Sequence, residues 1–321
     1  MAGGLTPGLT TFRRIPGTVV GPPAHHGPRR KAETVRTTWP SRDFQAPDGR
    51  PGIVTVNYNT RQLIAQLIYS LYRTLRPPEF SLVVVDNGST DGSAELLSSV
   101  AAAGLCHLIA NPENRYHGPG LNQGVSHLAA ATRRDDTVPI SYVWLLDSDC
   151  VVLRPDALST PCRVMRDTGA ALAGQRGYDR ADEDELLGLH SLLIDPVQVW
   201  QPAIQPFHDH GLPSEALQQS CAQAGVLALD FPYTRGGYII HIGRGSLRVI
   251  AQTGDRNNTH YEWATTHNQP HFALEADAPA AYAEFQAAFA HDVPTLDAGT
   301  LIQACQRPSG FGTPGPLGSS G

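Results

Sequence analysis

The sequence predicts an α/β protein built on a doubly wound, mainly parallel sheet. Short apolar runs alternate with segments of helical periodicity, and two of these runs end directly in aspartate. Turn-forming residues separate the successive units. Strands that are buried on both faces are continuously apolar, and a strand–helix–strand order gives right-handed parallel crossovers.

The first unit is a strand at 53–58 followed by a helix that runs to about Leu75. Leucines repeat every four residues from Leu63, which is the spacing of one helix face. Thr60 is expected to cap this helix, and Pro77 is expected to stop it.

The next units repeat this order. Strands are expected at 82–85, 106–109 and 141–146, with helices at about 92–103 and 121–132. Gly104 suits a left-handed residue at a helix end. Beyond these units we expect a helix from Pro155 to Asp167, a strand at 170–173, a helix near 214–224 and a strand at 237–242, in a segment whose pattern is irregular after Gly177.

Both ends of the chain differ in composition from the middle. Residues 1–50 are rich in Gly, Pro and Arg and are expected to form a flexible leader, because they bury too little apolar surface to offset their ordering entropy. Residues 308–321 are expected to be a disordered tail.

The bulk composition favours an ordinary globular protein. The 321 residues carry a formal net charge of -6, which disfavours nucleic acid as the main partner. Five cysteines without a CxxC pair argue against a disulfide framework and a zinc knuckle, and indicate a reducing compartment. No run has the length of a membrane span or of a secretory signal, so we expect a cytoplasmic protein.

Carboxylates follow two of the predicted strands. Asp86 comes directly after 82–85, and Asp147 and Asp149 come after 141–146. Ligands bind outside the carboxyl ends of strands in open α/β sheets, and alternate carboxylates can hold a hard divalent cation. We therefore expect a metal-dependent nucleotide site. The alternatives are an Asx turn at Asp86 and a capped turn with solvated acids at Asp147 and Asp149.

Four motifs occur in an order and spacing that resemble the family 2 inverting glycosyltransferases of GT-A fold, especially their rhamnosyltransferase-like branch. They are 54-VTVNYNTRQLI-64, 84-VVDNGSTDGSAELL-97, 111-NPENRYHGPGLNQGV-125 and 144-WLLDSDCVVLRPDAL-158. The resemblance covers about residues 52–175. It implies that residues 51–175 form the half that binds a nucleotide-sugar and that residues 176–307 form an acceptor-binding and catalytic-base region.

The resemblance assigns donor-binding roles to five residues of the first half. Asn57 and Tyr58 are expected along the base and ribose, and Asp86 is expected to bind the base. Arg115 and Asn122 are expected beside the diphosphate and sugar of the donor.

The same resemblance describes the metal. Asp147 is expected near the ribose and the metal, and Asp149 is expected to ligate Mn²⁺ or Mg²⁺ directly. His241 lies where the family has a histidine in an apolar strand; there it either completes the metal shell or is a satisfied core residue.

The catalytic base departs from the family pattern. Relatives carry a Glu-Asp pair, and here the aligned positions are Pro213 and Ser214. Glu215, Asp209 and His210 are the candidates that could deprotonate an acceptor hydroxyl, and it is also open that none of them acts.

These expectations define a metal-dependent glycosyltransferase that moves a sugar from a UDP- or dTDP-sugar to an acceptor hydroxyl with inversion. The acceptor is a glycan, a lipid-linked sugar or a small molecule, and the sequence does not distinguish them. The alternative is a non-catalytic sugar-nucleotide-binding protein, motivated by the missing acidic pair. A sugar nucleotidyltransferase is less favoured, because 57–62 contains no glycine.

Overall fold

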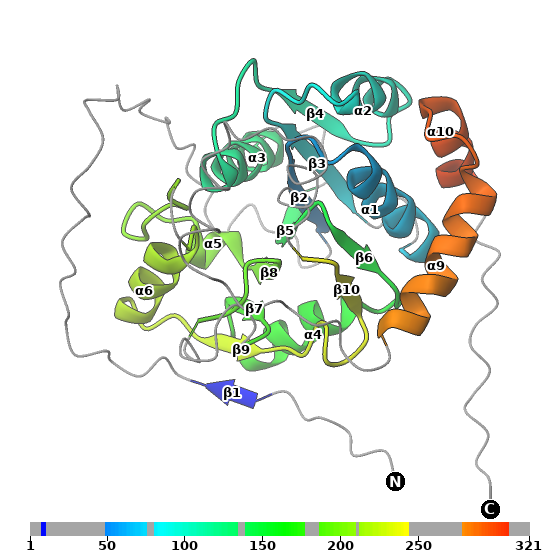
Figure 1. The fold of residues 1–321 in the computed structure, drawn as a ribbon. Coiled ribbons are helices and arrows are strands. Elements are labelled where there is room, and N and C mark those ends of the chain that lie inside the picture. The colour runs from blue at the N-terminus through cyan, green and yellow to red at the C-terminus, as the bar shows by residue number, and fades with distance from the viewer. Residues whose placement is uncertain are drawn as a thin grey trace, which may run out of the picture.

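The structure is a computed structural model, and it describes residues 8–10, 49–75, 80–133, 139–176, 186–209, 212–243 and 278–307. Helices cover both faces of a twisted sheet in this part of the chain (Figure 1). The strands are β1 (Gly8–Thr10), β2 (Arg50–Asn57), β3 (Ser81–Asp86), β4 (His107–Ala110), β5 (Ile140–Leu146), β6 (Cys150–Val152), β7 (Leu172–Gly174), β8 (Ser191–Ile194), β9 (Ala228–Asp230) and β10 (Ile239–His241). The helices are α1 (Arg61–Thr74), α2 (Ser93–Ala102), α3 (His117–Thr132), α4 (Ser159–Thr168), α5 (Pro196–Val199), α6 (Glu215–Gln223), α9 (Ala278–Asp292) and α10 (Ala298–Gln306).

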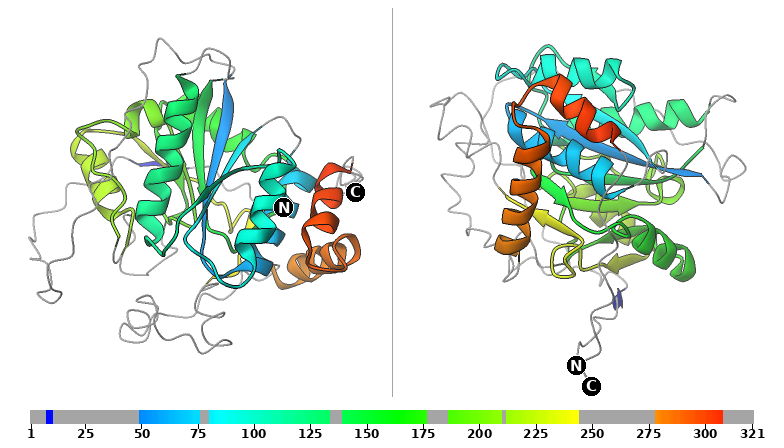
Figure 2. Two further views of the ribbon diagram at one scale, coloured as in Figure 1. Left: turned by 90° about the horizontal axis from the view of Figure 1, so that it is seen from above. Right: turned by 90° about the vertical axis from the view of Figure 1, so that its right-hand side faces the viewer.

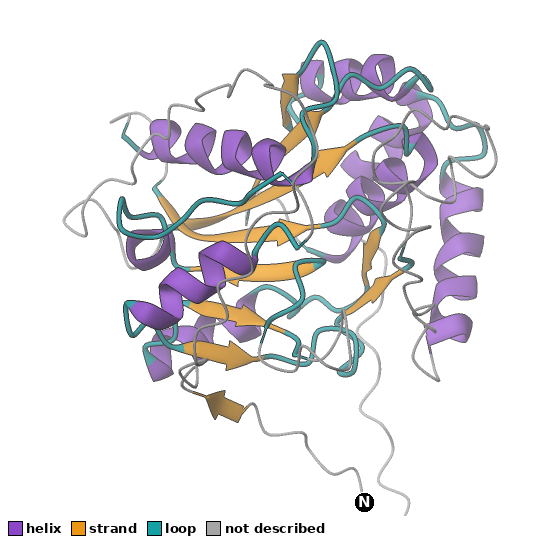
Figure 3. Cartoon of the chain, turned by 60° about the vertical axis from the view of Figure 1, so that its left-hand side comes forward, coloured by secondary structure: helices purple, strands orange, loops and turns teal. Residues whose placement is uncertain are grey.

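The main sheet has the strand order β1-β9-β7-β8-β5-β2-β3-β4. Strands β5, β2, β3 and β4 are parallel, which confirms the four predicted strand units. Strand β8 is antiparallel to both β5 and β7 and was not predicted. Its four residues lie in the segment that the sequence pattern left irregular, and a strand this short has no readable periodicity. Figure 3 shows the strands layered between helices.

Strand β10 corresponds to the run predicted at 237–242, but it does not join the main sheet. It pairs antiparallel with β6 in a separate two-stranded sheet. This small sheet begins directly after the DSD motif, so its register decides which residue lies opposite the aspartates.

Each central strand is buried on both faces. Ile53, Val84 and Trp144 face the core under α1, α2, α4, α9 and α10. Val54 and Val143 face the second core, under α3, α5 and α6. This two-sided burial explains why these strands read as continuous apolar runs.

The helix ends test two predictions. Gly104 has φ +74° at the end of α2, as predicted. Thr60 is the N-cap residue of α1, as predicted, but its side chain does not cap the helix, because its hydroxyl donates to Asn57 Oδ1 at 2.6 Å. Asp91 supplies the cap instead and accepts the Arg61 backbone N–H at 2.8 Å. Sequence neighbours could not reveal a cap that comes from a different loop.

Helices α9 and α10 pack beside α1, on the same side of the sheet (Figure 2). Phe289 is buried against Tyr69, with ring centroids 5.3 Å apart. The Tyr69 hydroxyl donates to Asp292 at 2.7 Å. Although these helices lie within 176–307, they cover the first half of the chain. No described helix is long and apolar enough to cross a membrane.

Part of the expected leader is ordered into a strand. Gly8–Thr10 forms β1 and pairs antiparallel with β9 at the sheet edge (Figure 1), and β2 already begins at Arg50. The rest of 1–48, residues 244–277 and the 308–321 tail lie outside the described residues.

Replacing Phe289 by Ala should destabilise the protein by about 3 kcal/mol, because it deletes a buried aromatic ring that joins α9 to α1. Urea unfolding followed by circular dichroism measures this loss. The exposed Glu284→Ala on the same helix is the matched control and should change stability by less than about 0.5 kcal/mol. Equal stability of the two variants would contradict the docking of α9.

Candidate active site

The polar residues predicted at strand ends do come to one edge of the sheet. Asn57 is the last residue of β2, and it lies in register with Asp86, the last residue of β3. Asp147 follows the last residue of β5, which is the other neighbour of β2. Three adjacent strands therefore present polar side chains at their carboxyl ends, where α/β sheets bind ligands.

A chain of hydrogen bonds joins these strand ends. Asn57 Nδ2 donates to Asp86 Oδ1 at 2.7 Å, and Asn57 Oδ1 accepts from the Thr60 hydroxyl at 2.6 Å. The Thr60 hydroxyl also lies 3.2 Å from that of Ser148, in the DSD turn. Because Asn57 is fully buried, these hydrogen bonds fix the spacing of the three strand ends.

Asp86 is 1% exposed and forms a turn with its own neighbours. Its Oδ2 accepts the Ser89 backbone N–H at 3.1 Å, and its Oδ1 accepts the Ser89 hydroxyl at 2.6 Å. The Asx turn raised as an alternative is therefore present. The role of Asp86 toward a base stays a prediction, since a carboxylate has lone pairs beyond those used here.

Asp147 and Asp149 lie against His241. His241 Nε2 is 3.1 Å from Asp149 Oδ1 and 3.5 Å from Asp147 Oδ2. The register of β6 with β10 causes this contact, because His241 pairs with Cys150 and the Ile242 N–H donates to the Asp149 carbonyl at 3.0 Å. His241 and Asp149 are both buried, whereas the side chain of Asp147 is 25% exposed to solvent.

Two further histidines join this cluster, and neither was predicted from the sequence. His117 Nε2, at the start of α3, lies 3.5 Å from Asp147 Oδ1. His190 stacks on His241 with ring centroids 4.9 Å apart. His117 stood within the quoted motif 111–125, so that motif was an available signal. His190 precedes the unpredicted strand β8 and had none.

The cluster balances charge inside the protein. Burial by itself would lower the pKa of His241, but the charge of Asp149 and hydrogen bonds to Asp147 and Asp149 raise it to about 10. Burial would likewise raise the pKa of Asp147, but His117 and His241 hold it well below its usual value. Burial lowers the pKa of His190 well below 6.5, so this ring is neutral.

The residues that suit a divalent cation are a subset of this cluster. Among the described residues, Asp149, Cys150 and His241 place ligand-type atoms within 4.8 Å of one another. Burial raises the pKa of Cys150 well above 9, and its thiol donates to the His190 carbonyl at 3.3 Å. A protonated thiol is a poor ligand. The carboxylate and the imidazole fit a cation, and the partly exposed Asp147 lies beside them.

The other predicted donor residues take different positions. Tyr58 is half-buried directly after β2, and Arg115 is exposed in the loop before α3. Asn122 is buried in α3, and its amide bonds the backbone of Phe207. Their roles toward a donor stay predictions, although the position of Asn122 indicates a structural task.

The three candidates for the base separate in space. Glu215 begins α6, and its Oε1 accepts from Gln219 Nε2 at 3.0 Å along the same helix. Asp209 is exposed and follows a backbone segment that packs on α3 at Gly118, next to His117. His210 lies outside the described residues.

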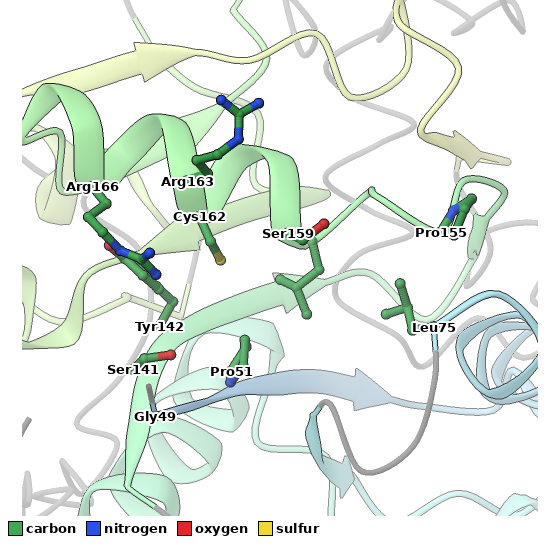
Figure 4. Close-up of a pocket in the computed structure, with 11 residues that line it drawn as sticks. Gly49, Pro51, Leu75, Ser141, Tyr142, Pro155, Ser159, Cys162, Arg163 and Arg166 are labelled. Carbon is green, nitrogen blue, oxygen red and sulfur yellow. The ribbon is translucent and has the colours of Figure 1, made fainter. Parts of the chain in front are cut away.

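A cavity of about 490 Å³ lies at the opposite ends of the central strands, near their amino termini (Figure 4). Its lining includes Pro51 at the start of β2, Tyr142 at the start of β5, and Arg166 from α4. The aspartates stand at the far ends of the same strands. The cavity is therefore separate from the aspartate cluster and contributes nothing to it.

The family of the chain follows from comparison with known proteins. The family model for glycosyl transferase family 2 matches residues 52–224. This match spans more than half of the chain and includes the strand-end residues, so the chain belongs to glycosyl transferase family 2. The comparison with curated proteins gives no match.

Three solved structures to which the chain is similar are distant from it in sequence. The mannosyltransferase PcManGT of Pyrobaculum calidifontis, in complex with GDP-Man and Mn²⁺, is 19% identical, with 81% of this chain and 76% of that chain covered and a TM-score of 0.46. TarS 1-349 of S. aureus with UDP-GlcNAc is 16% identical, with 56% of each chain covered and a TM-score of 0.42. Glucosyl-3-phosphoglycerate synthase of Mycobacterium tuberculosis with phosphoglyceric acid is 16% identical, with 55% and 67% covered and a TM-score of 0.40.

The charge balance around His241 gives a pH prediction for the metal-free protein. Its pKa is raised above the unfolded value of about 6.5, so its stabilising contribution is complete below that pH and is lost as the pH rises through about 10. Asp149→Asn should lower the His241 pKa by about one to three pH units. Histidine ¹⁵N chemical shifts measure it, with Asp156→Asn as control. An unchanged pKa in Asp149→Asn would contradict the ion pair.

Proposed function

We propose that this chain is a metal-dependent glycosyltransferase that moves a sugar from a UDP- or dTDP-sugar to an acceptor hydroxyl with inversion at the anomeric carbon. Two aspartates held against a buried imidazole, at the strand ends of a family 2 domain, carry this proposal. Such a cluster is costly to bury unless its charges are balanced, which supports a binding site here over a surface turn.

Asp149 and His241 are the residues that would hold the cation, with Asp147 beside them. The carboxylates suit either Mg²⁺ or Mn²⁺, and an imidazole is a ligand more usual for transition-metal ions than for Mg²⁺, so the donor set favours Mn²⁺ of the two. The cation would supply electrostatic stabilisation of the charge that develops on the departing diphosphate.

The donor would lie across the strand ends. Asp86 would accept a hydrogen bond from the ring N–H of uracil or thymine, with Asn57 holding its carboxylate in place. Tyr58 would line the base and ribose, and the exposed Arg115 would face the diphosphate. The four motifs support the rhamnosyltransferase-like branch and its UDP- or dTDP-linked donors.

Inversion would follow from a single displacement. The acceptor oxygen attacks the anomeric carbon, the bond to the diphosphate oxygen breaks, and the nucleoside diphosphate leaves with the electron pair. A base takes the hydroxyl proton in the same step. We assign this base to Asp209, because its segment packs at the start of α3 beside His117 and Asp147. Glu215 instead bonds Gln219.

A non-catalytic sugar-nucleotide-binding protein is the alternative, since the family's acidic pair is replaced here by Pro213 and Ser214. Both functions require a bound nucleotide. Only the enzyme releases UDP or dTDP from a sugar donor when an acceptor is supplied.

Asp149→Asn should lower transfer by about 10³-fold, because it removes a charged ligand while preserving the size of the side chain. Nucleoside diphosphate release from UDP-glucose or dTDP-rhamnose, with p-nitrophenyl glycosides as acceptors and Mn²⁺ present, measures this effect. The control is Asp156→Asn, a partly exposed carboxylate that pairs with Arg154. Near-normal turnover of Asp149→Asn would refute the metal role.

Asp209→Asn should lower kcat by about 10²- to 10⁴-fold, the usual contribution of a general base. Glu215→Gln should change kcat only a few-fold, since its carboxylate serves a contact within α6. The binding of UDP with Mn²⁺ should be the same in both variants. The opposite ranking would move the base to Glu215, and two active variants would leave neither residue in this role.

A further inference from the structure

The side chain of Asn122 holds the backbone of a loop from the second half of the chain. Its Nδ2 donates to the Phe207 carbonyl at 2.7 Å, and its Oδ1 accepts the Phe207 N–H at 3.1 Å. Asn122 is 6% exposed and Phe207 is 2% exposed, so both bonds are shielded from water. One amide therefore satisfies both backbone groups of a buried residue, and losing it would leave them unpaired.

The neighbouring glycine places the same loop directly on α3. A Cβ on Gly118 would lie 1.9 Å from the His208 carbonyl oxygen, so the backbone approach needs glycine. In addition, the His208 N–H donates to the Pro213 carbonyl at 3.0 Å. Residues 207–208 are thus fixed by side-chain bonds, by close packing and by a backbone bond.

The fixed residues link the aspartate cluster to the candidate base through the start of α3. His117, which precedes Gly118, is 3.5 Å from Asp147, and Asp209 follows His208 directly. The first turns of α3 therefore touch the cluster through His117 and the loop through Gly118 and Asn122. A shift of the loop on α3 changes the position of Asp209 relative to Asp147.

We propose that Asn122 is a positioning residue for the acceptor step, which it serves by fixing residues 207–208 on α3, and that it is not a ligand of the donor. This inference rests on the proposed function and deepens it. Both polar atoms of the Asn122 amide already face the Phe207 backbone. The same anchor explains how a helix of the first half sets the geometry of a base from the second half.

Two variants disturb the anchor by independent means. Asn122→Ala removes the paired hydrogen bonds, and Gly118→Ala inserts a methyl group against the His208 carbonyl. We expect each to lower kcat by about 10²-fold, the effect of roughly 1 Å of misplacement at a reacting group. The Kd for UDP in the presence of Mn²⁺, from titration calorimetry, should stay within about 2-fold of wild type, because the donor contacts are unchanged.

The matched control is Gly124→Ala in the same helix. Its Cβ would meet the Val54 side chain at 2.3 Å, on the face toward the sheet and away from the loop. Gly124→Ala should lower the stability of the protein. Its kcat, calculated for the fraction of protein that binds UDP, should be unchanged. This control separates the position of the loop from general damage to α3. Amide hydrogen exchange of 204–209 should rise in Asn122→Ala and Gly118→Ala and stay unchanged in Gly124→Ala.

The outcomes distinguish this inference from the proposed function. If wild type binds UDP but transfers no sugar to the p-nitrophenyl glycosides, the proposed function and the inference both fail. If wild type transfers sugar and Asn122→Ala does so equally fast, only the inference fails. A UDP affinity at least about 10-fold weaker in Asn122→Ala would assign Asn122 to the donor instead and would also overturn the inference.

Discussion

The pairing of β6 with β10 is the constraint on which the site depends. It places His241 opposite Cys150, and therefore against the carboxylates of Asp149 and Asp147. Two carboxylates this close to a buried strand end repel each other and lose hydration, and the imidazole compensates for both. The raised pKa of His241 and the lowered pKa of Asp147 both result from this attraction between the imidazolium and the carboxylates. A cation that takes the place of the His241 proton would preserve the charge balance.

This constraint also joins the two halves of the chain. Asp147 and Asp149 belong to the half that the sequence assigns to the donor, whereas His241 belongs to the other half. A second junction lies at the start of α3, where Gly118 and Asn122 hold residues 207–208. Groups of the two halves are therefore fixed to each other through contacts between residues that are distant in sequence.

The sequence predicted those parts of the structure that local patterns determine. Apolar runs that end in Asn57 and Asp86 marked the parallel strands and the edge where their ends meet. The sequence could not predict features that require distant partners. Asp91 rather than Thr60 supplies the side-chain cap of α1, His190 joins the cluster, and Asn122 faces a loop rather than a solvent-filled cleft. Each depends on which segments become neighbours after folding, and periodicity carries no such information.

Binding of UDP with and without a divalent cation tests the central claim most directly, because it requires neither the sugar nor the acceptor to be known. Isothermal titration calorimetry of the full chain should show UDP binding in Mn²⁺ that is lost in EDTA, and that is also lost in His241→Ala with Mn²⁺ present. UDP binding of equal affinity in EDTA, or undiminished binding by His241→Ala, would contradict the claim that the aspartate and histidine cluster holds a cation-bridged diphosphate.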